Sequence, residues 1–209
     1  MKIIYAYDAL CGWCYGFSPV IEAFHQKHRE EIDFEVLSGG MVTGSRIGPI
    51  GEVAPYIRHA YRDVEQATGV KFGEAFLKDV LEDGQTIFTS VPPAIAMSVF
   101  KSHRAEEAVL FASALQKAIY YDGLAPEDTA AYGQLAEEFG INKNIFTQQM
   151  AESKFLAEAQ KEFYRTQQLG VQGFPTVFAE VENTYYPLTR GYTPLDELEK
   201  RFATLTERI

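Results

Sequence analysis

The sequence predicts an α/β fold that a long helical segment interrupts. Three observations lead to this prediction: a strand–helix–strand order at the start, helical patterning in the middle, and a hairpin followed by a helix at the end. The chain has 209 residues, 46% of them hydrophobic and 13% aromatic, which is enough to bury a large core. We therefore expect one α/β unit that carries a helical insertion.

Charge and hydropathy exclude several classes of protein. The formal net charge is −10 and the pI is about 4.9, whereas proteins that bind nucleic acid or anionic lipid normally present a basic face. No segment approaches the roughly 18 apolar residues that a membrane span requires. The apolar run in residues 1–7 is too short for a signal peptide, so the expected location is the cytoplasm, where the chain is made.

The amino-terminal part predicts a βαβ opening. Residues 2–7 are rich in isoleucine and tyrosine, which favour a buried strand, and residues 32–37 alternate between apolar and acidic side chains, as in a second strand. Between them, apolar residues recur at helical spacing after Cys14. The residues that share this helix face are Phe17, Val20, Ile21 and Phe24.

The central and carboxyl-terminal parts complete the predicted order. Helix-like patterning covers four central segments, at residues 93–100, 106–120, 127–139 and 144–155. After residue 176, a β-branched run, a turn at residues 182–184 and a second run predict a hairpin, and Pro187 places its second strand at a sheet edge or a bulge. Thr193 is the expected cap of a last helix with Pro194 at its first position, and this helix presents the apolar residues Leu195, Leu198, Phe202 and Leu205.

The only two cysteines, Cys11 and Cys14, are separated by Gly12 and Trp13. A structural disulfide is a poor interpretation, because a bridge that closes so short a loop constrains the unfolded chain very little. A structural zinc site needs two further cysteine or histidine ligands, and the nearest histidines lie well over two helical turns downstream. We therefore expect no metal, and the pattern favours a redox-active pair.

The position of this pair favours thiol chemistry. Cys11 comes directly before the first turn of the predicted helix, where unpaired backbone N–H groups and the positive end of the helix dipole stabilise a thiolate. Only the thiolate attacks a disulfide, so Cys11 is the expected nucleophile. Cys14, one turn further into the helix, is then the resolving thiol.

The segments at residues 7–17 and 170–176, with Cys-Gly-Trp-Cys in the first and Gly-Phe-Pro-Thr in the second, resemble the DsbA-like branch of the thioredoxin fold. The resemblance extends to the cytoplasmic FrnE-type thiol–disulfide oxidoreductases. It implies a thioredoxin fold with a helical domain inserted between the second and third strands. Residues 1–38 and 170–209 would form the thioredoxin-like domain, and residues 39–169 the inserted helical domain.

The resemblance also implies roles for residues near the pair. Pro175 corresponds to a cis-proline that lies against the disulfide and, with Cys11 and Cys14, forms the catalytic set. The expected substrate-binding residues are Trp13, Phe174, whose backbone would pair with a bound peptide, and Thr176. Trp13 can equally be a surface aromatic residue that fills a turn, and Thr176 an ordinary strand residue.

Asp8, three residues before Cys11, has two open interpretations. The first is that its carboxylate caps the adjoining loop or helix, which is the commoner use of such a residue. The second is that it accepts or donates a proton for the resolving thiol.

The leading functional hypothesis is a thiol–disulfide oxidoreductase or isomerase that acts on cysteine-containing proteins or peptides. It needs no cofactor beyond its own disulfide, with glutathione as a candidate co-substrate. The segment 90–94, Ser-Val-Pro-Pro-Ala, is similar to kappa-class glutathione transferases and related isomerases, so a glutathione-dependent transferase or isomerase is one alternative. A non-catalytic DsbA-like protease adaptor is the other. The sequence leaves the oligomeric state open.

Overall fold

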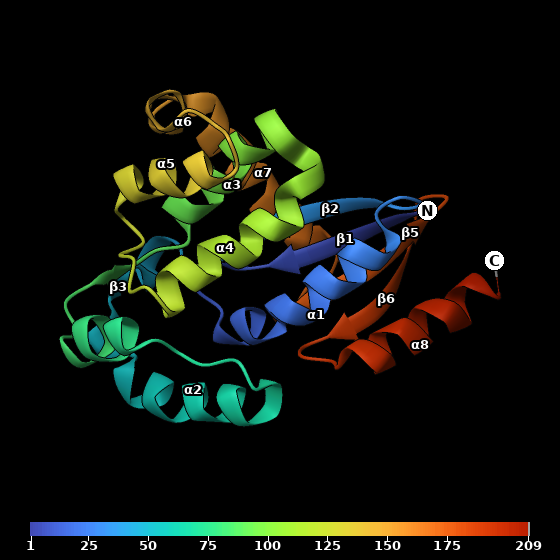
Figure 1. Cartoon of the computed structure of the whole chain (residues 1–209), viewed down its shortest axis with the longest axis horizontal. Helices are drawn as coiled ribbons and strands as arrows, with labels where there is room; N and C mark the ends of the chain where they lie inside the picture. The colour runs from blue at the N-terminus through green and yellow to red at the C-terminus, as the bar shows by residue number, and fades with distance from the viewer. Residues whose placement is uncertain (209) are drawn as a thin grey trace.

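Both ends of the chain contribute to one four-stranded sheet (Figure 1). The computed structural model describes residues 1–208 and places the strands in the order β2–β1–β5–β6. Strand β1 is parallel to β2 and antiparallel to β5, and β6 is antiparallel to β5. All the residues between β2 and β5 form a largely helical insertion, so the fold class is the one expected from the sequence.

The strands are β1 (Lys2–Tyr7), β2 (Asp33–Ser38), β3 (Gly48–Pro49), β4 (Ile87–Phe88), β5 (Thr176–Val181) and β6 (Thr184–Arg190). The α-helices are α1 (Gly12–His28), α2 (Ala54–Thr68), α3 (Val91–Arg104), α4 (Ala108–Tyr120), α5 (Thr129–Glu138), α6 (Lys143–Met150), α7 (Ser153–Gln168) and α8 (Leu195–Thr206). A π-helix covers Ala75–Glu82, and β3 pairs with β4 in a separate two-stranded sheet. No helix among residues 1–208 is long and apolar enough to cross a membrane.

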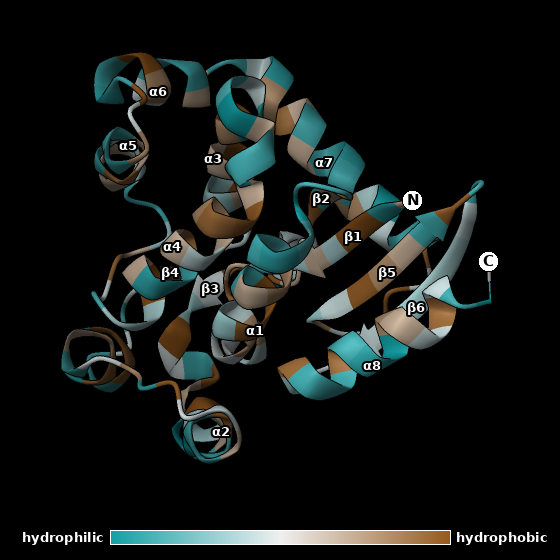
Figure 2. Cartoon of the chain, turned by 45° about the vertical axis from the view of Figure 1, so that its right-hand side comes forward, coloured by the Kyte–Doolittle hydropathy of each residue, from teal (hydrophilic) through white to brown (hydrophobic). Residues whose placement is uncertain are grey.

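Strand β1 occupies the interior of the sheet, and its side chains are buried on both faces. Ile3, Tyr5 and Tyr7 join the main core, which the helical insertion shares. Ile4 points to the opposite face and packs against residues of β2 and β5. Figure 2 shows hydrophobic residues along β1 and β5, whereas α8 is mostly hydrophilic on its outward side. A central strand that is buried on both faces does not alternate between apolar and polar residues. The strand predicted at residues 2–7 also lacks such an alternation.

The β5–β6 hairpin confirms the predicted turn and the interpretation of Pro187. Glu182 and Asn183 form a two-residue connection with φ values of 49° and 63°, as a type I′ turn requires. Strand β6 lies at the edge of the sheet, and its pairing with β5 shifts register next to Pro187, which lies opposite Phe178. The proline is therefore placed where the ladder tolerates a missing donor.

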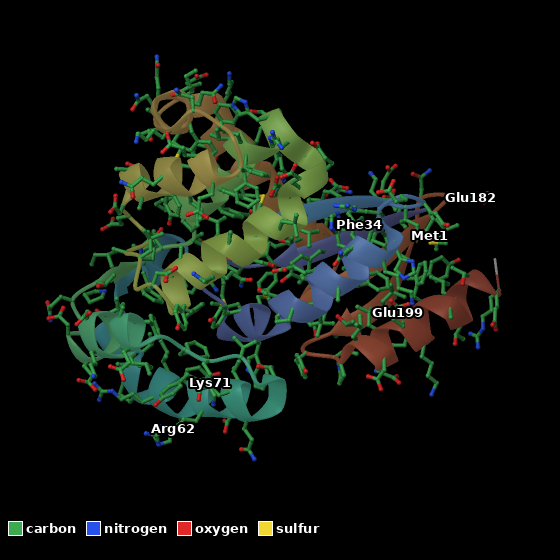
Figure 3. All side chains as sticks on the ribbon, in the orientation of Figure 1. Met1, Phe34, Arg62, Lys71, Glu182 and Glu199 are labelled. Carbon is green, nitrogen blue, oxygen red and sulfur yellow. The ribbon has the colours of Figure 1, made fainter. Side chains whose placement is uncertain are left out.

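Helix α8 lies along the carboxyl-terminal half of α1, and one carboxylate connects them. Glu199 of α8 lies 2.8 Å from the Lys27 ammonium and 3.1 Å from Nε2 of His28 (Figure 3). Leu198 and Phe202, two of the apolar residues predicted for the last helix, are buried beside this contact. Lys27 also lies in the last turn of α1, where a positive charge interacts favourably with the helix dipole. Lys27 therefore stabilises this end of α1 through the ion pair and through the dipole.

Three features of the helical insertion differ from the sequence prediction. The single helix expected at residues 144–155 is wrong, because α6 ends at Met150 and α7 begins at Ser153. Glu152 between them has extended backbone angles, a break that hydrophobic spacing does not reveal. Helix α2 was not predicted in detail, although Ile57, Tyr61 and Val64 recur on it at helical spacing. The π-helix was missed as well, although the apolar residues of its segment recur at helical spacing.

Two charged side chains from the insertion cover the free edge of the sheet at β2. Lys101 of α3 donates to the Val36 carbonyl over 2.9 Å, and Glu162 of α7 accepts from the Ser38 N–H over 2.9 Å. Lys101 and Glu162 also form an ion pair with each other. The pair occupies backbone groups that an unprotected edge strand would offer to another chain.

We expect Lys101→Met to lower the free energy of unfolding by about 1–3 kcal/mol, because it leaves the Glu162 carboxylate without its partner in a largely buried position. Urea unfolding measures the change. Lys78→Met is the matched control, since Lys78 forms an exposed ion pair with Glu74 and its loss should leave the unfolding midpoint nearly unchanged. Equal losses in the two variants would contradict the role given to Lys101.

Candidate active site

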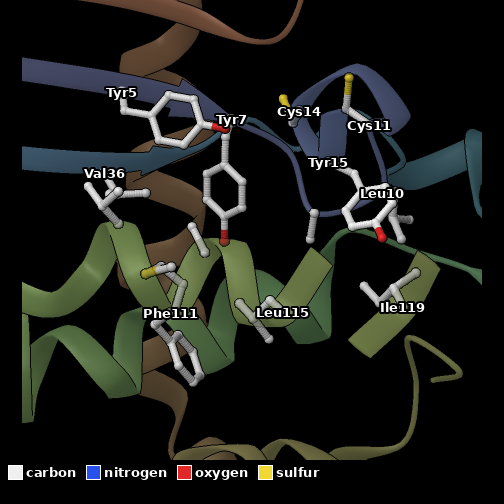
Figure 4. Close-up of a cluster of buried hydrophobic side chains, with 14 of the residues drawn as sticks. Tyr5, Tyr7, Leu10, Cys11, Cys14, Tyr15, Val36, Phe111, Leu115 and Ile119 are labelled. Atoms are coloured by element: carbon white, nitrogen blue, oxygen red, sulfur yellow. The ribbon is translucent and has the colours of Figure 1, made fainter. Parts of the chain in front are cut away.

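The two cysteines lie at the junction of β1 and α1, as the sequence predicts. Cys11 is the amino-terminal cap residue of α1, with extended backbone angles, and its carbonyl accepts from the N–H groups of Cys14 (2.9 Å) and Tyr15 (3.1 Å). Both cysteines are free thiols. Cys11 is 8% exposed and Cys14 is fully buried, so solvent and substrates reach Cys11 first. Figure 4 shows both at the margin of the buried cluster that includes Leu115 and Ile119 of α4.

The surroundings separate the acidities of the two thiols. A hydrogen bond from the Cys14 thiol, aided by the N–H groups of Cys14 and Trp13, lowers the pKa of the Cys11 thiol. Burial raises the pKa of the Cys14 thiol well above its ordinary value. Cys11 is therefore the thiol that ionises, and Cys14 remains protonated and donates to it.

The loop before β5 closes over Cys11. The Phe174–Pro175 peptide bond is cis, and the Cys11 thiol donates to the Phe174 carbonyl over an Sγ–O distance of 3.4 Å. The loop fits closely, because a Cβ atom added to Gly39 would lie 2.1 Å from the Phe174 ring. Residues that are 163 positions apart in the chain thus meet at the thiol.

The other two residues predicted to bind substrate have different environments. Trp13 is half-buried, its ring centroid lies 6.4 Å from that of Tyr192, and it borders a cavity of about 260 Å³. Thr176 is buried and its hydroxyl donates to the Gly173 carbonyl over 2.8 Å. Its hydroxyl is therefore engaged within the loop, whereas Trp13 offers an apolar surface next to Cys11.

The cavity beside Cys11 is almost entirely apolar. Its walls come from the start of α1, from the segment after β2 and from α2, and include Met41, Tyr56, Tyr61 and Phe72. Among residues 1–208, no charged side chain lines it. An uncharged or aromatic group can therefore be buried there without leaving a charge unpaired.

Asp8 holds the loop that leads to Cys11. One of its carboxylate oxygens accepts from the Leu10 N–H (2.9 Å) and the Ser90 hydroxyl (2.9 Å), and the other accepts from the Met41 N–H (2.7 Å). Burial raises the pKa of Asp8, although these hydrogen bonds oppose the increase. These contacts confirm that Asp8 caps the loop. A proton-transfer role has no hydrogen bond from Asp8 to either sulfur to support it.

Sequence reasoning missed two polar residues that contact the site, Ser90 and Gln116. Both lie in the helical insertion and are buried, Ser90 at 2% exposure and Gln116 at 0%. The available signal for Gln116 was an amide on the buried face of a helix, between Ala112 and Ile119. Among the described residues, no group of three or more histidine, cysteine, aspartate or glutamate side chains is arranged to hold a metal ion.

Comparison with known proteins places this chain in a family. The sequence profile of the DSBA-like thioredoxin domain matches residues 2–203, so the chain belongs to that family. The fold of this family, together with a cysteine pair at the junction of a strand and a helix, is that of the thiol–disulfide oxidoreductases. A search among curated protein sequences finds no match.

Solved structures resemble the chain over its whole length. A Nitrosomonas europaea protein, described as a candidate protein disulfide isomerase, has a TM-score of 0.85 and 25% identity, and the match covers 100% of this chain and 99% of that one. The cytosolic disulfide reductase DsbM from Pseudomonas aeruginosa, solved with GSH, has a TM-score of 0.80 and 25% identity, with 100% of both chains covered. A 2-hydroxychromene-2-carboxylate isomerase, at 14% identity and a TM-score of 0.68 over 100% of this chain and 97% of that one, shares the fold.

Proposed function

We propose that this protein exchanges thiols and disulfides through Cys11 and Cys14, with Cys11 as the nucleophile and Cys14 as the resolving thiol. The observation that carries the proposal is the contrast between the two thiols. Cys11 retains 8% exposure and has a lowered pKa, and Cys14 is fully buried with a raised one. A reactive thiol beside a protected one is what a two-step exchange requires.

In the reducing direction, the Cys11 thiolate attacks one sulfur of a substrate disulfide. A Cys11–substrate bond forms, the substrate S–S bond breaks, and the other substrate sulfur leaves as a thiolate that takes a proton from water. Cys14 then loses its proton and attacks Cys11, which forms the Cys11–Cys14 disulfide and releases the second substrate thiol. Two electrons pass from the protein dithiol to the substrate, and the oxidising direction reverses each step.

The site supports binding of an extended substrate segment beside the sulfurs. The Phe174 N–H has no hydrogen-bond acceptor within residues 1–208 and lies on the loop that contacts Cys11. A backbone carbonyl of a substrate peptide placed there would lie next to the Cys11 sulfur. Pro175 would keep side-chain ligands away from that sulfur. Cysteine-containing proteins or peptides are therefore the proposed substrates.

Glutathione is the proposed small-molecule partner. DsbM, which matches this chain at 25% identity, was solved with GSH and is described as cytosolic. By that similarity we extend both properties to this chain, with two glutathione molecules reducing the Cys11–Cys14 disulfide and leaving as glutathione disulfide. A cytoplasmic location would supply glutathione in its reduced form.

A redox titration tests the proposal. The protein is equilibrated in buffers with different ratios of reduced to oxidised glutathione, and the fluorescence of Trp13, the single tryptophan, reports the state of the adjoining pair. We expect one reversible transition that fits a two-electron couple. The double variant Cys11→Ser, Cys14→Ser is the control and should give a constant signal. A wild-type protein that forms no disulfide at any ratio would refute the proposal.

The apolar cavity favours one second candidate, a glutathione-dependent transferase or isomerase that uses Cys11 alone. An uncharged electrophile could occupy the cavity beside the Cys11 sulfur. This activity would survive in Cys14→Ser and would convert an uncharged electrophile in the presence of glutathione, whereas thiol–disulfide exchange gives no product from such an electrophile. Turnover assays of Cys14→Ser with an uncharged electrophile, with and without glutathione, therefore separate the two functions.

A further inference from the structure

A buried amide side chain from the helical insertion contacts the backbone around the cysteine pair. Gln116 of α4 is 0% exposed and has the apolar residues Leu115 and Ile119 as neighbours on its helix. Burying an amide costs free energy unless its donors and acceptor are paired. The partners of Gln116 therefore show what this side chain is placed to do.

All the partners of Gln116 belong to the active-site segment. Its Nε2 atom donates to the Asp8 carbonyl over 3.2 Å and contacts the Cys11 carbonyl at 3.5 Å. Its Oε1 atom accepts from the Ser18 hydroxyl over 3.1 Å. One amide thus connects the end of β1, the peptide group of the nucleophile and the second turn of α1.

Ser18 extends this contact to the second cysteine. The Ser18 hydroxyl lies 3.3 Å from the Cys14 carbonyl as well as 3.1 Å from Oε1 of Gln116. Since a hydroxyl has one proton, these two acceptors compete for it. The position of Gln116 is therefore coupled to the peptide group of Cys14.

The bonds from Gln116 are not needed to keep these carbonyls paired. The Asp8 carbonyl already accepts from the Cys11 N–H over 3.0 Å, and the Cys11 carbonyl accepts from two N–H groups of the first helical turn. Without Gln116, both carbonyls would retain a backbone partner. Its contribution is thus to the position and charge distribution of the turn rather than to satisfying buried polar atoms.

We propose that Gln116 is a positioning residue that holds the first turn of α1 and sets the redox equilibrium of the Cys11–Cys14 pair. The inference rests on the proposed function. The amide N–H groups of Gln116 face the oxygen atoms of the Asp8 and Cys11 carbonyls and offset part of the negative charge on these oxygens. This favours the Cys11 thiolate, and a stabilised thiolate makes the reduced form more stable and the disulfide more oxidising.

The test compares wild type with Gln116→Met, in which a side chain of similar length makes none of the three contacts. We expect the equilibrium constant for reduction by glutathione to fall about three- to tenfold, where tenfold corresponds to about 30 mV toward a more reducing potential. We also expect the pKa of the Cys11 thiol to rise, as read from the ultraviolet absorbance of the thiolate. Thermal unfolding monitors whether the variant is folded.

Two further variants complete the design. Ser113→Ala lies on the same helix, is buried, and has a hydroxyl bonded only to its own helix at Val109, so it should leave both readouts unchanged. Ser18→Ala removes one partner of Gln116 and should shift both readouts in the same direction by a smaller amount. If Gln116→Met does not fold, Ser18→Ala decides the question.

The outcomes distinguish this inference from the proposed function. A wild-type protein without a reversible transition would refute the proposed function itself. A wild-type protein that titrates normally, together with folded Gln116→Met and Ser18→Ala variants of unchanged potential and Cys11 acidity, would overturn the role of Gln116 alone. A shift in Ser113→Ala equal to that in Gln116→Met would also overturn it, because the effect would then belong to packing of α4.

Discussion

Replacing Cys11 by serine is expected to abolish thiol–disulfide exchange, with a fall in rate of at least about a thousandfold. A serine hydroxyl is a far weaker nucleophile at neutral pH than a thiolate whose pKa is lowered by its neighbours. The rate of reduction of a fluorescent peptide disulfide, with glutathione as the electron donor, measures the change.

Cys14→Ser tests the second step separately. Cys11 can still attack, but no thiol is left to release the substrate, so we expect a covalent adduct between Cys11 and the peptide. Mass spectrometry without reductant should detect this adduct in Cys14→Ser and not in the Cys11→Ser, Cys14→Ser double variant. Full exchange activity in both single variants would show that the pair does not carry the chemistry.

Asp8→Ala is expected to cause the largest loss of stability, with the free energy of unfolding lower by about 2–4 kcal/mol. Asp8 accepts from Leu10, Met41 and Ser90, and all three donors would lose their partner in or near the core. Relief of the cost of burying the carboxylate offsets part of this loss. Chemical denaturation followed by circular dichroism measures the difference.

Asp83→Ala is the matched control for Asp8→Ala. Asp83 also accepts from an N–H two residues ahead, that of Gln85, but the contact is exposed to solvent. The expected loss there is below about 0.5–1 kcal/mol. Similar losses in both variants would contradict the special role of Asp8 in holding the active-site loop.

The raised pKa of Asp8 adds a dependence on pH. A carboxyl group whose pKa is higher in the folded state stabilises the fold below its unfolded pKa, and this contribution disappears as the pH rises through the folded pKa. Relative to Asp8→Asn, the wild-type protein should therefore be most stable in acid and lose this advantage on the way to neutral pH. A difference in unfolding free energy that does not vary with pH would contradict the raised pKa.

Much of the fold could be predicted because short stretches of sequence indicate which helix or strand they form. The first strand, the apolar face of α1, the β5–β6 turn and the last helix each follow from residues adjacent in the chain. The helical insertion was harder to predict. Helix α2 was not predicted in detail although Ile57, Tyr61 and Val64 recur on it at helical spacing, and the break between α6 and α7 depends on the backbone angles of Glu152.

The site shows the same division between local and distant information. The location of Cys11 before the first turn of a helix is a local property, and the structure confirms it. The partners of the active-site loop come from distant positions: Phe174 reaches the Cys11 thiol, Ser90 reaches the Asp8 carboxylate, and Gln116 reaches the Asp8 carbonyl. Nothing in the spacing of these residues indicates that they meet.

The sequence by itself therefore determined the class of fold and the position of the cysteine pair, and it predicts the order in which the two thiols act. These features depend on side-chain periodicity and on the helix terminus, both of which are encoded within a few neighbouring residues. The tertiary structure alone decided which buried polar groups hold the pair. Each of those contacts depends on where the helical insertion packs, and that packing results from the whole core rather than from any local pattern.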